Sequence, residues 1–185
     1  MADLHESRLA LITVLASQAP GGYIGRTALM KYMYFLQVLR GVPLGYRFTL
    51  YSYGPFDSDV LADLGSAEAL STVKSELERY SGGYWYKIRP DDHADWIRER
   101  AASFLAKYQT DVNWVVEKFG GLGSAELELD STIIYADREA LDRREKIDLP
   151  EVAKRVHEIK PHFSQEQVQS HASRLVEEGL LKAVA

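Results

Sequence analysis

The five histidines are the first residues to test for chemistry, because imidazole is a frequent general base and metal ligand. They are His5, His93, His157, His162 and His171. No two of them lie four residues apart, so no helical face carries the histidine pair that binds zinc in many metalloenzymes. His157 and His162 could meet in space, but surface or hydrogen-bonded histidines are the favoured interpretation. We expect no metal site.

Acidic, glycine and serine residues also lack the spacing that catalysis requires. Glu126, Glu128 and Asp130 are two residues apart and would diverge on a helix. The glycine-rich segment 120–124 lacks the Gly-Lys-Ser/Thr ending of a phosphate-binding loop and is interpreted as a hinge. The chain has no cysteine and no Gly-x-Ser-x-Gly motif. We therefore predict no catalytic residue, no cofactor and no enzymatic activity.

Charge is distributed unevenly along the 185 residues. Residues 1–90 carry nine Lys or Arg and eight Asp or Glu, a balance of +1, whereas residues 91–185 carry thirteen and nineteen, a balance of −6. Dedicated DNA-binding domains usually show a strong basic excess. The balance of +1 permits a local basic patch but does not indicate one.

The N-terminal apolar stretch is short and is interrupted by charge. Its apolar run from Leu9 to Ala16 cannot span a bilayer, and Asp3 and Glu6 do not suit the basic start of a signal peptide. We expect no membrane association and a cytoplasmic location.

Turn and cap residues divide residues 1–90 into helices followed by a hairpin. A helix is expected over 4–18, and a second between Gly25 or Thr27 and Gly41. The alternating segment 46–53 predicts a short strand, or an extended segment packed on both sides, that Gly54-Pro55 breaks. Asp57 or Ser58 then caps a helix to about Leu64. The turn at residues 81–83 predicts a β-hairpin over 72–89, although its first arm could also be helical.

Three helices followed by a hairpin is the order of elements in a winged helix. Residues 91–185 are predicted to be helical, with caps at Asp91 or Asp92, Thr110 or Asp111, and Ser124. A further helix starts near Pro150, and another follows the capping box of Ser164 and Gln167. The predicted fold is mainly α with a minor β part. It has a winged-helix-like half over 1–90 packed against a helical half over 91–185, together forming one compact unit.

Basic and aromatic residues occur together at two places in the first half. Arg26 and Lys31 lie one turn apart in the second helix, while Arg79, Lys87 and Arg89 flank Tyr84 and Trp85 on the hairpin. Such mixtures suit nucleic-acid backbones. They equally suit protein interfaces, where aromatics and Arg are enriched. A solvated hairpin without a partner remains a third interpretation.

Two short segments resemble a known family. The segment 29–37, with Leu29, Lys31 and Tyr34, is followed by Tyr53, Gly54, Pro55 and Phe56. Over residues 23–64 this resembles the SocA-like antitoxin family (Panacea domains), and a small uncharacterised bacterial group of the YwgA type. The resemblance implies a mostly helical, non-catalytic protein that neutralises a partner toxin or adapts it for proteolysis. The resemblance assigns no single residue a contact with a toxin. We add Lys31, Tyr34 and Tyr53 to the partner- or DNA-binding candidates.

Two hypotheses for function follow. In the first, the chain is a protein-interaction and regulatory module, antitoxin-like, whose partner is a toxin-like protein. In the alternative, it is a winged-helix transcriptional regulator that binds DNA. The acidic total charge favours the first hypothesis. A homodimer is compatible with both.

Overall fold

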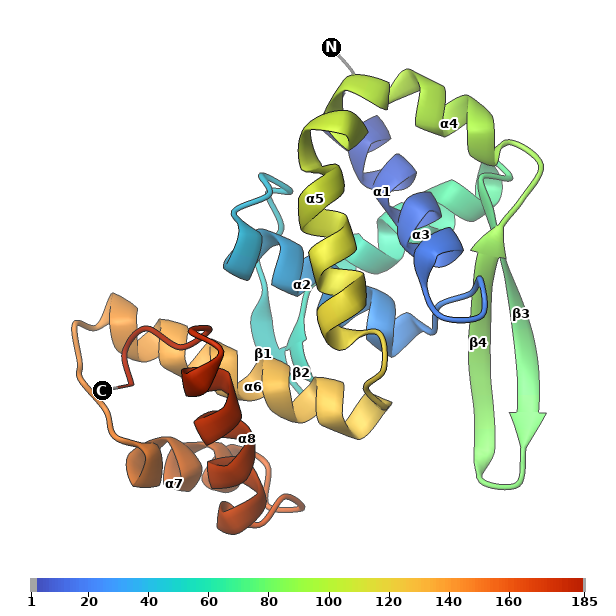
Figure 1. Ribbon diagram of the computed structural model, residues 1–185. Helices are drawn as coiled ribbons and strands as arrows, with labels where there is room; N and C mark the ends of the chain where they lie inside the picture. Colours follow the sequence, from blue (N-terminus) through green and yellow to red (C-terminus); the bar gives the residue numbers. More distant parts are fainter. Residues whose placement is uncertain (1–2, 185) are drawn as a thin grey trace. The chain divides into compact units, whose positions relative to one another are not determined.

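Eight helices and two antiparallel β-hairpins make up residues 3–184, which the computed structural model describes (Figure 1). The mainly α fold with a minor β part is confirmed. In chain order the elements are α1 (Leu4–Gln18), α2 (Arg26–Arg40), β1 (Thr49–Tyr51), β2 (Gly54–Phe56), α3 (Ser58–Ala69), β3 (Val73–Tyr80), β4 (Gly83–Pro90), α4 (Ala94–Arg100), α5 (Ala102–Phe119), α6 (Ser124–Asp142), α7 (Leu149–Ile159) and α8 (Gln165–Glu177).

Contacts divide the chain into two compact units whose limits differ from the expected division at residue 90. The first unit contains residues 3–48 and 57–122, so α4 and α5 belong with the N-terminal elements. The second unit contains residues 49–56 and 123–184, and therefore includes the β1–β2 hairpin from the N-terminal part of the sequence.

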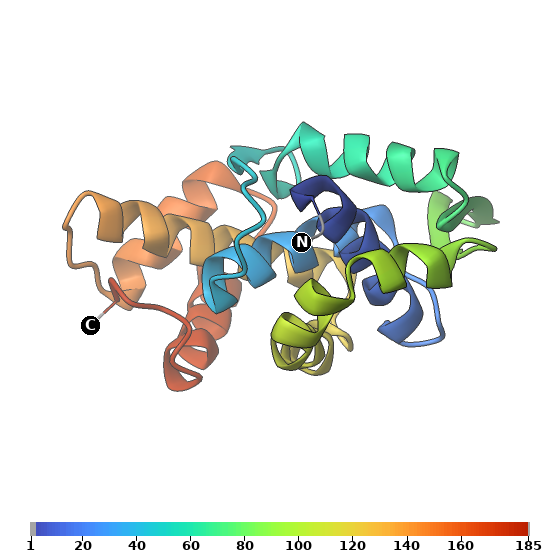
Figure 2. The ribbon, with the colours of Figure 1, turned by 90° about the horizontal axis from the view of Figure 1, so that it is seen from above.

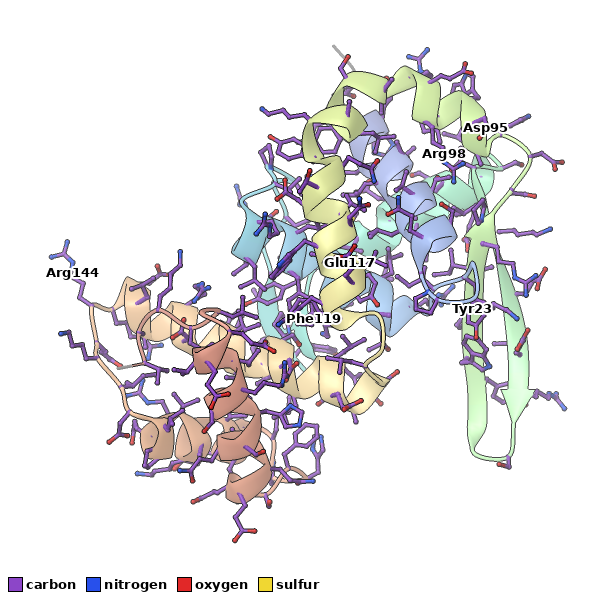
Figure 3. All side chains as sticks on the ribbon, in the orientation of Figure 1. Tyr23, Asp95, Arg98, Glu117, Phe119 and Arg144 are labelled. Atoms are coloured by element: carbon purple, nitrogen blue, oxygen red, sulfur yellow. The ribbon has the colours of Figure 1, made fainter. Side chains whose placement is uncertain are left out.

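Helix α1 forms the centre of the first unit because its middle part, residues 9–16, is buried on every side. Helices α3, α4 and α5 and strand β4 pack around it (Figure 2). A helix that is hydrophobic all round must be enclosed by other elements. Against α2, α5 contributes Phe119, whose ring stacks on Phe35 with centroids 4.0 Å apart (Figure 3).

The predicted winged-helix order of elements is present in this unit. Between α1 and α2, Ile24 exchanges two backbone hydrogen bonds of 2.9 Å with Ile88 of β4. The β3–β4 hairpin is antiparallel along its whole length, from the pair Val73–Pro90 to the pair Tyr80–Gly83. The helical alternative for its first arm is thereby excluded. The distal part of the hairpin extends beyond the helices of the unit (Figure 1).

The strand predicted within residues 46–53 is confirmed only for Thr49–Tyr51, and the predicted break at Gly54-Pro55 is wrong, because both residues belong to a second strand. Thr49–Tyr51 pairs with Gly54–Phe56 across a two-residue loop. Gly54 takes the positive φ of 87° that this reversal needs. Tyr46 is instead held by the side-chain amide of Gln37, which bonds its backbone N–H and C=O at 2.9 Å each.

Local cap signals were accurate at several helix ends. Gly41 ends α2 in the left-handed conformation, Asp57 caps α3, and Ser164 forms the expected capping box with Gln167. The expected cap at Thr110 or Asp111 is wrong, because α5 continues through both residues. The break in this region lies at Ala101, between α4 and α5.

No helix within residues 3–184 combines the length and the apolar character required to cross a bilayer.

Two buried tyrosines of the first unit should make its stability fall at alkaline pH. Burial raises the pKa of Tyr32 to about 12. The pKa of Tyr46 is raised more than that of Tyr32. Burial is the larger cause, and the second is the hydrogen bond that the Tyr46 hydroxyl donates to Asp63 at 2.7 Å. A folded-state pKa above the unfolded value of about 10 stabilises the fold below pH 10, and that stability is lost as pH rises towards 12.

We therefore expect the free energy of unfolding to decrease between about pH 10 and pH 12, and Tyr32→Phe to reduce this slope. Denaturant titrations at several pH values measure the slope. Tyr53→Phe is the matched control, because Tyr53 is 70% exposed. An identical slope in the parent protein and in Tyr32→Phe would contradict the assignment.

Candidate partner-binding surface

The register of the β3–β4 hairpin sorts its side chains onto two faces. Residues directly opposite each other in an antiparallel pair lie on the same face, and successive residues alternate. One face contains the pairs Leu77–Tyr86 and Arg79–Tyr84, and it continues towards the unit's core with Ser75–Ile88 and Val73–Pro90. Val73 and Ile88 are buried, whereas the distal half of this face is open.

The open half of that face combines aromatic, aliphatic and cationic side chains. Leu77 is 55% exposed and Tyr84 is 57% exposed. The Arg79 guanidinium lies 5.1 Å from the centroid of the Tyr84 ring, and that of Arg26, from the start of α2, lies 3.5 Å from the Tyr86 centroid. We call these five residues, Arg26, Leu77, Arg79, Tyr84 and Tyr86, the arginine–tyrosine face.

On the opposite face of the hairpin, Lys87 is paired with an acidic side chain of the same face. Lys87 Nζ lies 3.2 Å from Glu78 Oε1 and 4.3 Å from the ring centroid of Tyr23. Tyr23 also packs on Trp85, with centroids 5.3 Å apart, and its side chain lies beside β4 (Figure 3). These contacts hold the root of the hairpin to the segment that follows α1. They leave Trp85 half-buried rather than free for a partner.

The structure separates the three cations that the sequence grouped together on the hairpin. Arg79 belongs to the arginine–tyrosine face, whereas Lys87 and Arg89 lie on the opposite face. Lys87 is paired with Glu78, and the Nε of Arg89 is buried without a hydrogen-bond partner among the described residues. They do not form one continuous track for phosphates.

The remaining candidates lie apart from the hairpin. Lys31 and Tyr34 are each only 2% exposed within α2, and Tyr34 packs edge-on against Phe48. Neither can contact a partner in this conformation. Tyr53 is exposed, but it lies in the β1–β2 loop of the second unit.

Helix α3 occupies the position of the recognition helix, immediately before the hairpin, yet it is acidic. It contains Asp59, Asp63 and Glu68 with no Lys or Arg, and its N-cap is Asp57. Recognition helices lie in the major groove, between rows of phosphates. Asp63 is buried and paired with His5 and Arg8, but α3 has no cation to offset Asp59 and Glu68, which a duplex would repel.

Ionic clusters in the second unit join segments that are distant in sequence. Lys160 Nζ lies 3.0 Å from Glu128 Oε1 and donates hydrogen bonds to the carbonyls of Tyr51 and Ser52. Asp130, fully buried, accepts from His171 Nδ1 at 2.7 Å and from Arg174. These ion pairs and hydrogen bonds hold helices and loops of the unit together. They could not be predicted from the spacing of neighbouring residues, because the partners are far apart in the sequence.

A small cavity of about 130 Å³ in the same unit adjoins the Asp130–His171 pair. It is lined by Ala125, Glu126, Leu129, Phe163, Gln167 and His171. Its polar side chains already have structural partners. Glu126 accepts from Gly123 N–H at 2.8 Å, Gln167 accepts from Ser164 N–H, and His171 bonds Asp130. Among residues 3–184, no three histidine or carboxylate side chains are grouped to hold a metal ion.

Sequence reasoning identified Arg26, Arg79 and Tyr84 but missed Leu77 and Tyr86. Both missed residues follow from the strand alternation once the turn is fixed, since Leu77 and Arg79, like Tyr84 and Tyr86, are two residues apart.

Comparison with protein-family models finds no match for this chain, and comparison with curated proteins finds no significant relative.

Proposed function

We propose that this chain is a non-catalytic protein-interaction module that regulates a protein partner, and that it binds this partner through the β3–β4 hairpin. The observation that carries the proposal is the arginine–tyrosine face. It offers exposed Leu77 and Tyr84 on a projecting ribbon. Exposed aromatic and arginine residues are the side chains most enriched at the centres of protein interfaces. The resemblance at residues 23–64 supports a toxin-like partner, neutralised or adapted for proteolysis.

The order of elements in the first unit supports a second candidate, a winged-helix DNA-binding regulator. The acidic α3 and the division of Arg79 from Lys87 and Arg89 between two faces favour the protein partner. A wing that bound DNA would have to do so without cations on the preceding helix.

Tyr84→Ala should weaken binding of the partner by at least about 2 kcal/mol, or about thirtyfold in affinity, because the exposed ring is the natural anchor of the surface. The first partner to test is the product of a neighbouring toxin-like reading frame, co-purified with the full chain and titrated by calorimetry. Trp96→Ala is the control, since Trp96 is also exposed but lies on α4.

Duplex binding separates the two candidates. Anisotropy at about 50 and about 200 mM salt should show no submicromolar affinity for DNA at the higher concentration. Submicromolar binding of DNA at about 200 mM salt would contradict the proposal if Arg79→Gln and Lys87→Gln weaken it and substitutions of Tyr84 and Trp85 do not. The chain would then be a winged-helix DNA-binding regulator.

A further inference from the structure

We infer that the partner segment that binds the arginine–tyrosine face is acidic, with at least two carboxylates that meet Arg26 and Arg79 on either side of an apolar anchor. This inference rests on the proposed function and specifies the chemistry of the partner. It follows from the charge, the pairing and the spacing of the face.

The face carries positive charge without any compensating carboxylate. The strand residues on this face are Val73, Ser75, Leu77 and Arg79 of β3 and Tyr84, Tyr86, Ile88 and Pro90 of β4, and none of them is Asp or Glu. Within the described part of the chain, neither Arg26 nor Arg79 forms an ion pair, although both are exposed. The opposite face differs, because there Lys87 is paired with Glu78 and Lys74 lies 3.9 Å from Asp91.

Stacking on tyrosine prepares both guanidinium groups for carboxylates. Each lies over an aromatic ring, which limits side-chain freedom and leaves the N–H edges of the fork available. A planar guanidinium binds a carboxylate through two parallel hydrogen bonds. Less conformational entropy is lost on binding when the side chain is already oriented.

The same stacking disfavours a single-stranded nucleic acid. Bases bind such proteins by stacking on open aromatic faces. Here the Arg26 guanidinium lies over one face of Tyr86, which leaves Tyr84, 57% exposed, as the more open ring, so successive bases would lack a second open ring on which to stack.

The spacing of the face defines the partner segment further. Arg26 lies over Tyr86, and Arg79 lies over Tyr84, two residues along the same strand. Two residues of strand correspond to about 7 Å. Carboxylates two residues apart in an extended segment match this distance, as do carboxylates four residues apart on a helix, whose Cβ atoms are about 6 Å apart. Leu77, opposite Tyr86, provides the apolar contact between them.

The test uses the full chain and a short labelled peptide in which glutamates alternate with leucines, with a glutamine counterpart as the uncharged control. Anisotropy at about 50 mM salt should show binding of the glutamate peptide, weakened about fivefold or more by exchange of its glutamates for glutamine. Arg26→Gln and Arg79→Gln should each cause a loss of about the same size. Lys74→Gln, which removes one positive charge from the opposite face, should change the affinity less than twofold.

The inference would be overturned by no binding of the glutamate peptide, by equal binding of the two peptides, or by equal binding to the Arg26→Gln/Arg79→Gln double variant. Arginine-dependent competition by a single-stranded oligonucleotide would assign the face to nucleic acid instead. Circular dichroism verifies that each variant is folded. If a protein partner binds in a way that depends on Tyr84 but on neither arginine, the inference of an acidic partner segment is wrong, whereas the proposed function is still supported.

Discussion

Asp137→Ala should lower the free energy of unfolding of the second unit by about 3–5 kcal/mol, the cost of removing one partner from a buried charged network. Asp137 is fully buried in α6 and pairs with Arg138. Its carboxylate accepts backbone N–H groups from Lys182 at 3.0 Å, Ala183 at 2.8 Å and Val184 at 3.3 Å. A single carboxylate thus holds the segment that follows α8.

The alanine variant leaves these donors without their acceptor and Arg138 without its carboxylate, although Arg138 retains its bond to the carbonyl of Leu180. Denaturant unfolding followed by circular dichroism measures the loss. Hydrogen exchange at residues 182–184 should accelerate in the native state. Asp142→Ala removes an exposed carboxylate from the end of the same helix and should cost less than about 0.5 kcal/mol. A loss below about 1 kcal/mol for Asp137→Ala would show that this anchor is dispensable.

The structure agrees with the sequence where the determining chemistry is local. Gly41 ends α2 because it accepts a positive φ, and Ser164 and Gln167 start α8 by bonding each other's backbone N–H groups. Such signals need only three or four neighbouring residues. The hairpin between residues 73 and 90 was predictable for the same reason, since its turn and its strand-forming residues are adjacent.

Errors arose where tertiary contacts decide the outcome. Tyr46 alternates with its neighbours as a strand residue would, but Gln37 occupies its backbone groups and Asp63 accepts its hydroxyl. Lys31 lies among Leu29, Met30, Tyr32 and Met33, and it is buried with them, although a lysine side chain more often reaches solvent. Both residues depend on side chains that local periodicity does not specify.

The candidate surface was predictable in composition but not in geometry. The basic and aromatic residues of the hairpin are evident in the sequence, whereas their division between two faces depends on the register. The acidic character of α3 was also present in the sequence. It became informative once the order of elements placed this helix immediately before the wing.

Lys160→Met should destabilise the second unit by about 3–5 kcal/mol, because it removes a buried cation and leaves the buried carboxylate of Glu128 without its ammonium partner. Lys160 is 4% exposed. Its ammonium lies 3.0 Å from Glu128 and donates to the carbonyls of Tyr51 and Ser52 at the β1–β2 loop. The variant would leave Glu128 with His162, at 3.4 Å, as its remaining basic neighbour among the described residues.

A double-mutant cycle separates the ion pair from the loop contacts. Glu128→Leu combined with Lys160→Met removes both buried charges, and replacement of a whole buried pair by apolar groups is often close to neutral. We therefore expect the double variant to recover more than half of the stability lost in Lys160→Met. The stability that the double variant does not recover measures the hydrogen bonds that Lys160 donates to the carbonyls of Tyr51 and Ser52, since these carbonyls still lack their donor. Lys154→Met, an exposed position on α7, the helix that ends immediately before Lys160, is the matched control. Recovery of none of the stability would show that Lys160 acts through the β1–β2 loop alone, and that its pairing with Glu128 contributes nothing to the fold.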